Sequence, residues 1–218
     1  MQTLNKKDSI IIALVAIAGV FTAVIGVKAT GTSHTSTATI NATVLETMTL
    51  SCGNATIPNL TANTPQSVQA ACTANTNGAA GFNLKVHSTT SGADATKNLL
   101  HTDTTTWIIN TGTGLSTYTG LPASTALWTA GTTKGLGFRV RSTSGGTTNA
   151  NTNTDWGVDE TAGNAKYAAF PLTDQTIYNY GSYSGSASAV NIDYKLDVPT
   201  TQKAGSYSGT VLYTATTN

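Results

Sequence analysis

The pentapeptide Gly-Ser-Tyr-Ser-Gly occurs twice in this chain of 218 residues, at 181–185 and at 205–209. Glycines around a serine-containing centre invite comparison with the nucleophile turn of hydrolases, in which Gly-x-Ser-x-Gly exposes a reactive serine. That turn needs serine as its third residue, and the third residue here is Tyr183 or Tyr207. Both copies therefore fail as nucleophile turns.

Histidine, the commonest general base, occurs at three scattered positions. His34 lies in a polar segment near the N-terminus, and His101 lies in the loop-like sequence Leu-Leu-His-Thr-Asp. His87 alternates with apolar neighbours, so we expect it to point outward. We expect surface histidines with no catalytic role, and hence a protein that is not an enzyme and carries no cofactor.

One polar stretch has the spacing of a calcium-binding loop. Amide and carboxylate side chains alternate in it, and a glutamate stands twelfth from the first, where such a loop has its last ligand. The residues are Asn149, Asn151, Asn153, Asp155 and Glu160. The loop also requires an acidic first residue and a glycine in sixth place, where this chain has Asn149 and Thr154. A solvated polar loop is the competing interpretation, and we expect no metal site elsewhere.

Aromatic side chains in the middle of the chain are candidates for a glycan platform, because a flat ring can stack on the face of a sugar. The candidate platform consists of Trp128, Trp156, Tyr178 and Tyr180. The alternative is that these rings anchor long loops and that Trp107 belongs to the core.

The N-terminal segment predicts export. Lys6 and Lys7 precede an apolar run from Ile10 to Val27, and small residues stand before a cleavage point after Ala29. This is the pattern of a secretory signal peptide. The apolar run is also long enough to remain in a membrane as an uncleaved helix with the lysines inside. Prepilin-type cleavage before Ser9 is a third possibility, and all three export residues 30–218.

Charge and cysteine content agree with an extracellular location. The chain has 11 Lys and Arg against 10 Asp and Glu; the segment up to Ala29 holds three of the former and one of the latter, which leaves eight against nine. With no basic stripe, nucleic acid is not an expected partner. In an exported chain the only two cysteines, Cys52 and Cys72, predict one disulfide.

The elements that would position these residues are strands. Helix formers are sparse and threonine, serine, asparagine and glycine are abundant, a balance that favours strands joined by polar turns. Alternating segments predict strands from Thr37, at 68–73, around Phe82–Val86, around Trp107, at 136–141, at 190–198 and at 206–216. The sequence predicts an all-β fold: a single antiparallel Ig-like or pilin-like β-sandwich at 30–218 with long polar loops, after a hydrophobic export helix at 1–29.

The C-terminal sequence resembles the last hairpin of small exported prokaryotic β-sandwich proteins, among them fimbrial-type and spore-coat-U subunits and WxL surface domains. The shared motif is Ala-Gly-x-Tyr-x-Gly-Thr-Val at 204–211, and the start of the first predicted strand also resembles theirs. A WxL domain would have Trp-x-Leu where this chain has Tyr213-Thr214-Ala215, so attachment to peptidoglycan is not implied.

The resemblance implies a cell-surface structural protein without catalysis. Fimbria-like subunits polymerise by lending an N-terminal strand to a neighbour's sheet. The matching segment here would present Thr37, Thr39, Ile40, Ala42 and Val44, although a first strand of the chain's own domain has the same pattern. We therefore expect a homopolymeric surface filament or pilus. The alternative is a monomeric adhesin or carbohydrate-binding module whose partner is a cell-wall or host glycan. Contact with a membrane is expected only through an uncleaved N-terminal segment.

Overall fold

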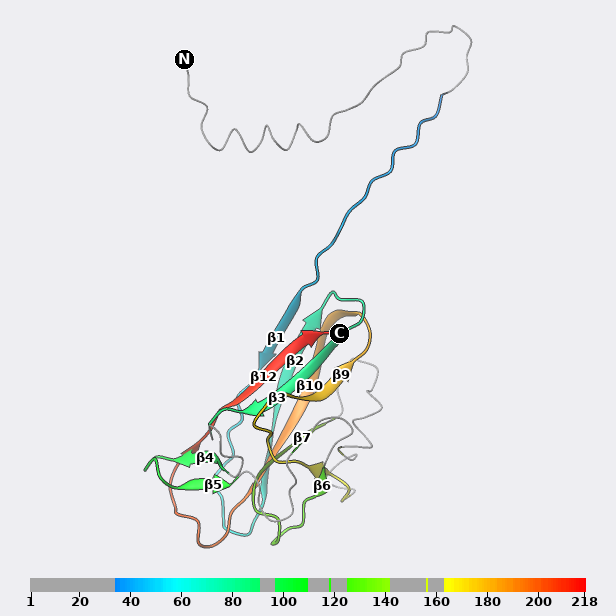
Figure 1. Cartoon of the computed structure of the whole chain (residues 1–218). Helices are drawn as coiled ribbons and strands as arrows, with labels where there is room; N and C mark the ends of the chain where they lie inside the picture. Colours follow the sequence, from blue (N-terminus) through cyan, green and yellow to red (C-terminus); the bar gives the residue numbers. More distant parts are fainter. Residues whose placement is uncertain (1–33, 91–96, 110–117, 119–124, 142–155, 157–162) are drawn as a thin grey trace, which may run out of the picture. The chain divides into compact units, whose positions relative to one another are not determined.

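The computed structural model of the chain describes residues 34–90, 97–109, 118, 125–141, 156 and 163–218 (Figure 1). Within these ranges, every element with described bounds is a strand, and every strand pairing is antiparallel. The strands are β1 (Met48–Cys52), β2 (Gln66–Thr76), β3 (Phe82–Ser88), β4 (Lys97–His101), β5 (Trp107–Ile109), β6 (Ala126–Leu127), β7 (Gly135–Val140), β8 (Lys166–Tyr167), β9 (Gln175–Tyr180), β10 (Ser184–Asp197), β11 (Tyr207–Ser208) and β12 (Val211–Thr217).

The chain divides into two units, Met1–Thr43 and Val44–Asn218. In the first unit, the described residues 34–43 are exposed and form no strand. All twelve described strands belong to the second unit. The described residues include no helix long and apolar enough to span a bilayer.

The largest sheet of the second unit has the order β1-β2-β10-β7. Strand β10 lies at its centre and pairs with β2 from Leu196 opposite Gln66 to Ser184 opposite Thr76. Apolar residues recur at every second position of both strands, and this period places them on one face of a sheet. At the edge, β1 pairs with β2 alone among the described strands, from Met48 opposite Thr76 to Cys52 opposite Cys72.

A second sheet has the order β12-β3-β9 and places the C-terminal strand at an edge. The inward residues of β3 are fully buried, and they form one core cluster with the apolar face of β2 and β10. Strands β1 and β12 lie side by side where the two sheets meet (Figure 1). Tyr194 of β10 and Tyr213 of β12 join the sheets through a hydroxyl contact of 2.6 Å.

Two smaller sheets complete the described part of the second unit. One has the order β11-β4-β5, and the other pairs β6 with β8. Tyr167 of β8 belongs to a separate cluster with Trp128, Ala165 and Ala169, hereafter the β6–β8 cluster. An isolated bridge between Phe138 and Ala168 connects the β8 region to β7. The expected all-β, antiparallel architecture is thus confirmed for the described residues, whereas the export helix expected at 1–29 lies outside them.

The first strand begins later than expected. The alternating sequence from Thr37 predicts a strand, but residues 34–47 form none and β1 starts at Met48. Period two reports a side-chain pattern and cannot identify a hydrogen-bonding partner. Strand β2 ends at Thr76, which faces Met48, so it offers residues before Met48 no further strand position.

The last two strands do not form the expected hairpin. The sequence predicts that the segment at 206–216 folds back on the strand at 190–198. Instead it divides into β11, which pairs with β4, and β12, which pairs with β3. The chain therefore crosses from one sheet to the other after β10, and the final strand makes a contact distant in sequence.

Candidate functional site

The histidine side chains do not assemble catalytic machinery in the described residues. His34 is exposed. His87 Nδ1 lies 2.6 Å from Asp174 Oδ1. His101 is buried, which corrects the expected surface position. Its Nδ1 accepts from the backbone N–H of Asp103 at 3.0 Å, and its Nε2 lies 3.2 Å from the carbonyl oxygen of Ala204. Both ring nitrogens of His101 therefore contact backbone groups.

Metal-binding candidates receive no support from the described ranges. No group of three or more His, Cys, Asp or Glu side chains is gathered there in a way that could hold an ion. The calcium candidates Asn149, Asn151, Asn153, Asp155 and Glu160 lie outside the described residues.

The four aromatic residues expected to form a glycan platform do not present one. Trp156 and Tyr178 are fully buried, and the Trp156 ring stacks on Tyr118 with centroids 5.2 Å apart. Tyr180 is half-buried against Phe82, and Trp128 is half-buried and meets Tyr167 edge to face. A sugar needs an accessible ring face, and the rings of Trp156 and Tyr178 are buried in the core. The expectation that the four residues form one shared platform is therefore wrong.

The second copy of the pentapeptide is a packing element. The Tyr207 hydroxyl donates to the carbonyl of Lys203 and accepts from Gln202 Nε2, both at 2.7 Å. Its ring lies 4.8 Å from that of His101. Gly205 has φ of +142°, and a Cβ there would lie 2.1 Å from His101 Nε2. Only glycine combines this backbone conformation with so close an approach.

The first copy is built differently. Its Ser184 begins β10, is buried, and places Oγ 3.2 Å from Ser188 Oγ. The two copies therefore occupy unrelated environments. Sequence identity over five residues does not reveal a duplicated module here.

Asp103 joins the turn after β4 to the segment before β11. Its carboxylate accepts from the backbone N–H groups of Thr105 and Thr106 and from Lys203 Nζ at 2.8 Å. The hydrogen bond from Lys203, followed by those from the two backbone groups, holds the pKa of Asp103 well below its usual range. The same interaction raises the pKa of Lys203.

The outer face of β7 and β10 carries the polar residues of their alternating pattern, and it is covered rather than exposed to water. Arg139 is fully buried and donates from Nε to Asp193 Oδ2 at 3.0 Å. Asp197 is also fully buried and accepts from Lys134 at 2.7 Å. Buried charges require such partners because desolvation is costly. The β6–β8 cluster lies over this face, where Lys195 Nζ approaches the Tyr167 ring to 5.2 Å.

The expected disulfide is confirmed. Cys52 and Cys72 are bonded and stand opposite each other on β1 and β2. Edge strand β1 is therefore tied covalently to β2, the strand with which it pairs. Any segment that continues from β1 toward the N-terminus is attached to a fixed point of the sheet.

That segment, residues 34–45, is hereafter the leader. It contains the candidate donor residues, and every one of its residues is exposed. Ile40, Val44 and Leu45 expose 92%, 81% and 79% of their surface. The side chain of Asn77 holds the junction with β1, donating to the carbonyl of Leu45 at 2.9 Å and accepting from the backbone N–H of Thr47 at 2.6 Å. The leader thus departs from a defined point beside the turn after β2.

The sequence shows the apolar alternation of the leader, but it does not show that the leader forms no strand with the other described residues. It gave no signal for the contact between His101 and the second pentapeptide, because pairing between β4 and β11 joins residues about a hundred positions apart in sequence. Comparisons with protein-family models, with curated proteins and with solved structures found no match to this chain.

Proposed function

We propose that this chain is a non-enzymatic extracellular structural protein whose copies assemble into a surface filament by strand donation. In this proposal the second unit is a pilin-like β-sandwich and the leader is the donated strand. The export pattern at the N-terminus and the disulfide support an extracellular location.

The sandwich architecture is supported by the shared core. The sheet β1-β2-β10-β7 and the sheet β12-β3-β9 each turn an apolar face into the same cluster of buried residues. Alternation along β3 and β10 leaves polar residues on the opposite faces. Two antiparallel sheets that pack in this way have the layer arrangement of a sandwich.

The exposed leader is the single observation that carries the proposal. Ile40 and Val44 expose most of their apolar surface, and burying each would contribute about 1.5–3 kcal/mol. Added strand pairing contributes about 1 kcal/mol for each backbone hydrogen bond. The edge of a neighbouring sheet can bury the apolar side chains and pair with the backbone at the same time. Strand addition is the binding mode that combines these two contributions.

Deletion of residues 30–44 tests this function. The shortened chain should fold, because the described residues removed are exposed and belong to no strand. It should no longer form filaments visible by electron microscopy or sediment as a polymer. Filaments formed by the shortened chain would refute strand donation by the leader, and a wild-type chain that stays monomeric would refute the filament.

A matched pair of variants separates the two faces of the leader. Ile40→Asn with Val44→Asn changes the apolar face, whereas Thr39→Asn with Thr43→Asn changes the alternate face at the same spacing. The first pair should abolish sedimentation of polymers and the second should preserve it. Equal loss in both would contradict recognition through an apolar face.

A further inference from the structure

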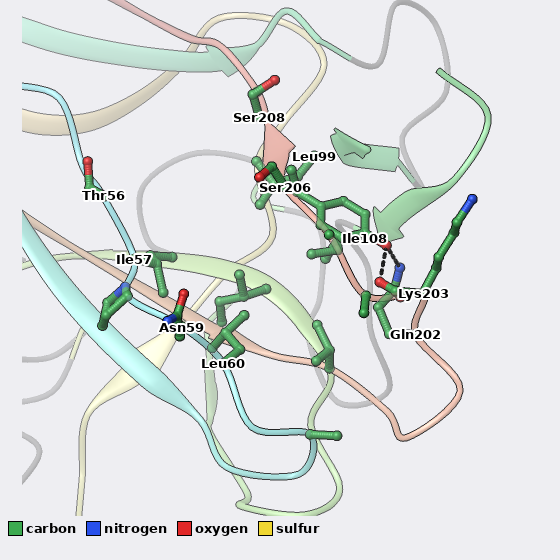
Figure 2. Close-up of a pocket in the computed structure, with 18 of the residues that line it drawn as sticks. Thr56, Ile57, Asn59, Leu60, Leu99, Ile108, Gln202, Lys203, Ser206 and Ser208 are labelled. Atoms are coloured by element: carbon green, nitrogen blue, oxygen red, sulfur yellow. Dashed lines mark hydrogen bonds between the residues drawn. The ribbon is translucent and has the colours of Figure 1, made fainter. Parts of the chain in front are cut away.

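A groove of about 710 Å³ opens at one end of the second unit (Figure 2). Residues 55–60 form one wall, and residues 202–209 form the other. Its floor is apolar and comes from β4, β5 and the end of β10. The floor residues are Leu99, Ile108, Leu196 and Val198.

The groove combines the two features that an added strand requires. Ile57 and Leu60 line its first wall half-exposed, so the apolar surface continues up from the floor. The other wall contains β11, an edge strand that pairs only with β4 among the described residues. An apolar floor beside an unpaired strand edge suits an extended peptide whose alternate side chains are apolar.

We infer that this groove receives the leader of a second copy of the chain, an inference that rests on the proposed function. Ile40, Ala42 and Val44 share one face of the leader by their spacing. That face lies on the groove floor, and the leader backbone runs beside β11.

The chain's own leader cannot fill the groove with these residues. Asn77 holds Leu45 near the end of β2 where Thr76 faces Met48. The groove floor includes Leu196, which faces Gln66 at the other end of β2. With 11 residues in β2, these two ends lie about 33 Å apart at about 3.3 Å per residue.

The length of the leader decides whether the groove can receive the leader of the same chain or only that of another copy. Ile40 precedes Leu45 by five residues, which span at most about 18 Å when fully extended. Val44 is adjacent to Leu45 and reaches less. The occupant is therefore the leader of another copy.

The base of the leader at Leu45 and the groove floor at Leu196 lie toward opposite ends of β2, so the contact between copies is head-to-tail. Each copy uses one surface to donate and a different surface to accept. Repetition of such a heterologous contact produces an open filament when the rotation between copies does not close a ring. Because the two surfaces are separate, each can be changed by a substitution that leaves the other intact.

Two single variants test the inference in the full exported chain. Ile40→Lys places a positive charge on the leader, and Leu60→Lys places one of the same sign on the groove wall, so the two changes cannot compensate each other. Each alone should reduce the sedimenting polymer by at least about tenfold, because a charge without a partner on an apolar contact costs more than the 1.4 kcal/mol of a tenfold change. Mixed together, they should form a species of two chains and no longer polymer, since the leader of the Leu60→Lys chain and the groove of the Ile40→Lys chain are intact, whereas the other leader and groove both carry a positive charge.

Thermal unfolding checks that both variants are folded. If Leu60→Lys fails to fold, Ser208→Trp replaces it, because Ser208 is exposed and lines the opposite wall of the groove. A folded groove variant that still forms wild-type filaments overturns the groove assignment and leaves strand donation standing. A mixture that shows no two-chain species also overturns it. A wild-type chain that never assembles removes the proposed function itself.

Discussion

Removal of the Cys52–Cys72 disulfide should destabilise the second unit by about 3 kcal/mol, as the chain-entropy account gives for a loop of this length. The bond joins residues 20 positions apart and ties edge strand β1 to β2. Without it, the unfolded chain gains freedom, whereas the folded strand remains paired with β2. The appropriate change is Cys52→Ala with Cys72→Ala, which leaves no free thiol.

Urea unfolding followed by tryptophan fluorescence measures this loss. With a dependence of about 2 kcal/mol per molar urea, the midpoint should fall by about 1.5 M. The double variant also provides the control for reduction: dithiothreitol should shift the wild-type midpoint toward that of the variant and leave the variant unchanged. An unchanged midpoint in the variant would refute the stabilising role of the bond. An effect of dithiothreitol on the variant would show that the reductant acts elsewhere.

Four further substitutions test individual contacts and backbone conformations. Gly131→Ala should lower the free energy of unfolding by about 1–2 kcal/mol. The loss comes only from the positive φ, since nothing lies within 4 Å of the added Cβ. Gly205→Ala adds a collision and should lower the melting temperature more; equal losses would refute the close approach. Asp103→Asn should destabilise the protein at pH 7, and the difference should shrink below about pH 4, because a lowered pKa stabilises above the unfolded-state value and is lost on acidification. A difference as large at pH 2 as at pH 7 would contradict this. Tyr194→Phe should cost about 1 kcal/mol by removing the hydroxyl contact with Tyr213, and an unaltered urea midpoint would show that water replaces it.

Local pattern determined much of the second unit. Alternation around Phe82 and around Val190 predicts strands because side chains of a strand point to opposite faces in turn, and β3 and β10 occupy those positions. The pairing of Cys52 with Cys72 follows from an even cysteine count in an exported chain. The strands depend on residues close together in sequence, and the disulfide follows from the number of cysteines.

Pattern failed where a partner distant in sequence decides the outcome. Asp193 alternates with apolar residues, a pattern typical of a strand with one face in water, yet the β6–β8 cluster covers its side of the sheet and Arg139 compensates its charge. Aromatic residues such as Trp156 are candidates for ligand binding because of their side chains, but the residue type does not indicate whether the side chain is buried. Each difference arises from coverage by another element, which no period in the sequence encodes.

The sequence by itself determined that this is a threonine-rich chain of antiparallel strands with one disulfide and an apolar, alternating segment before its first core strand. Only the tertiary structure decided that β12 pairs with β3, that β11 borders a groove, and that β2 ends where it leaves the leader without a strand partner. The physical reason is that alternation fixes which side chains share a face, whereas register and strand order depend on packing between segments far apart in the chain.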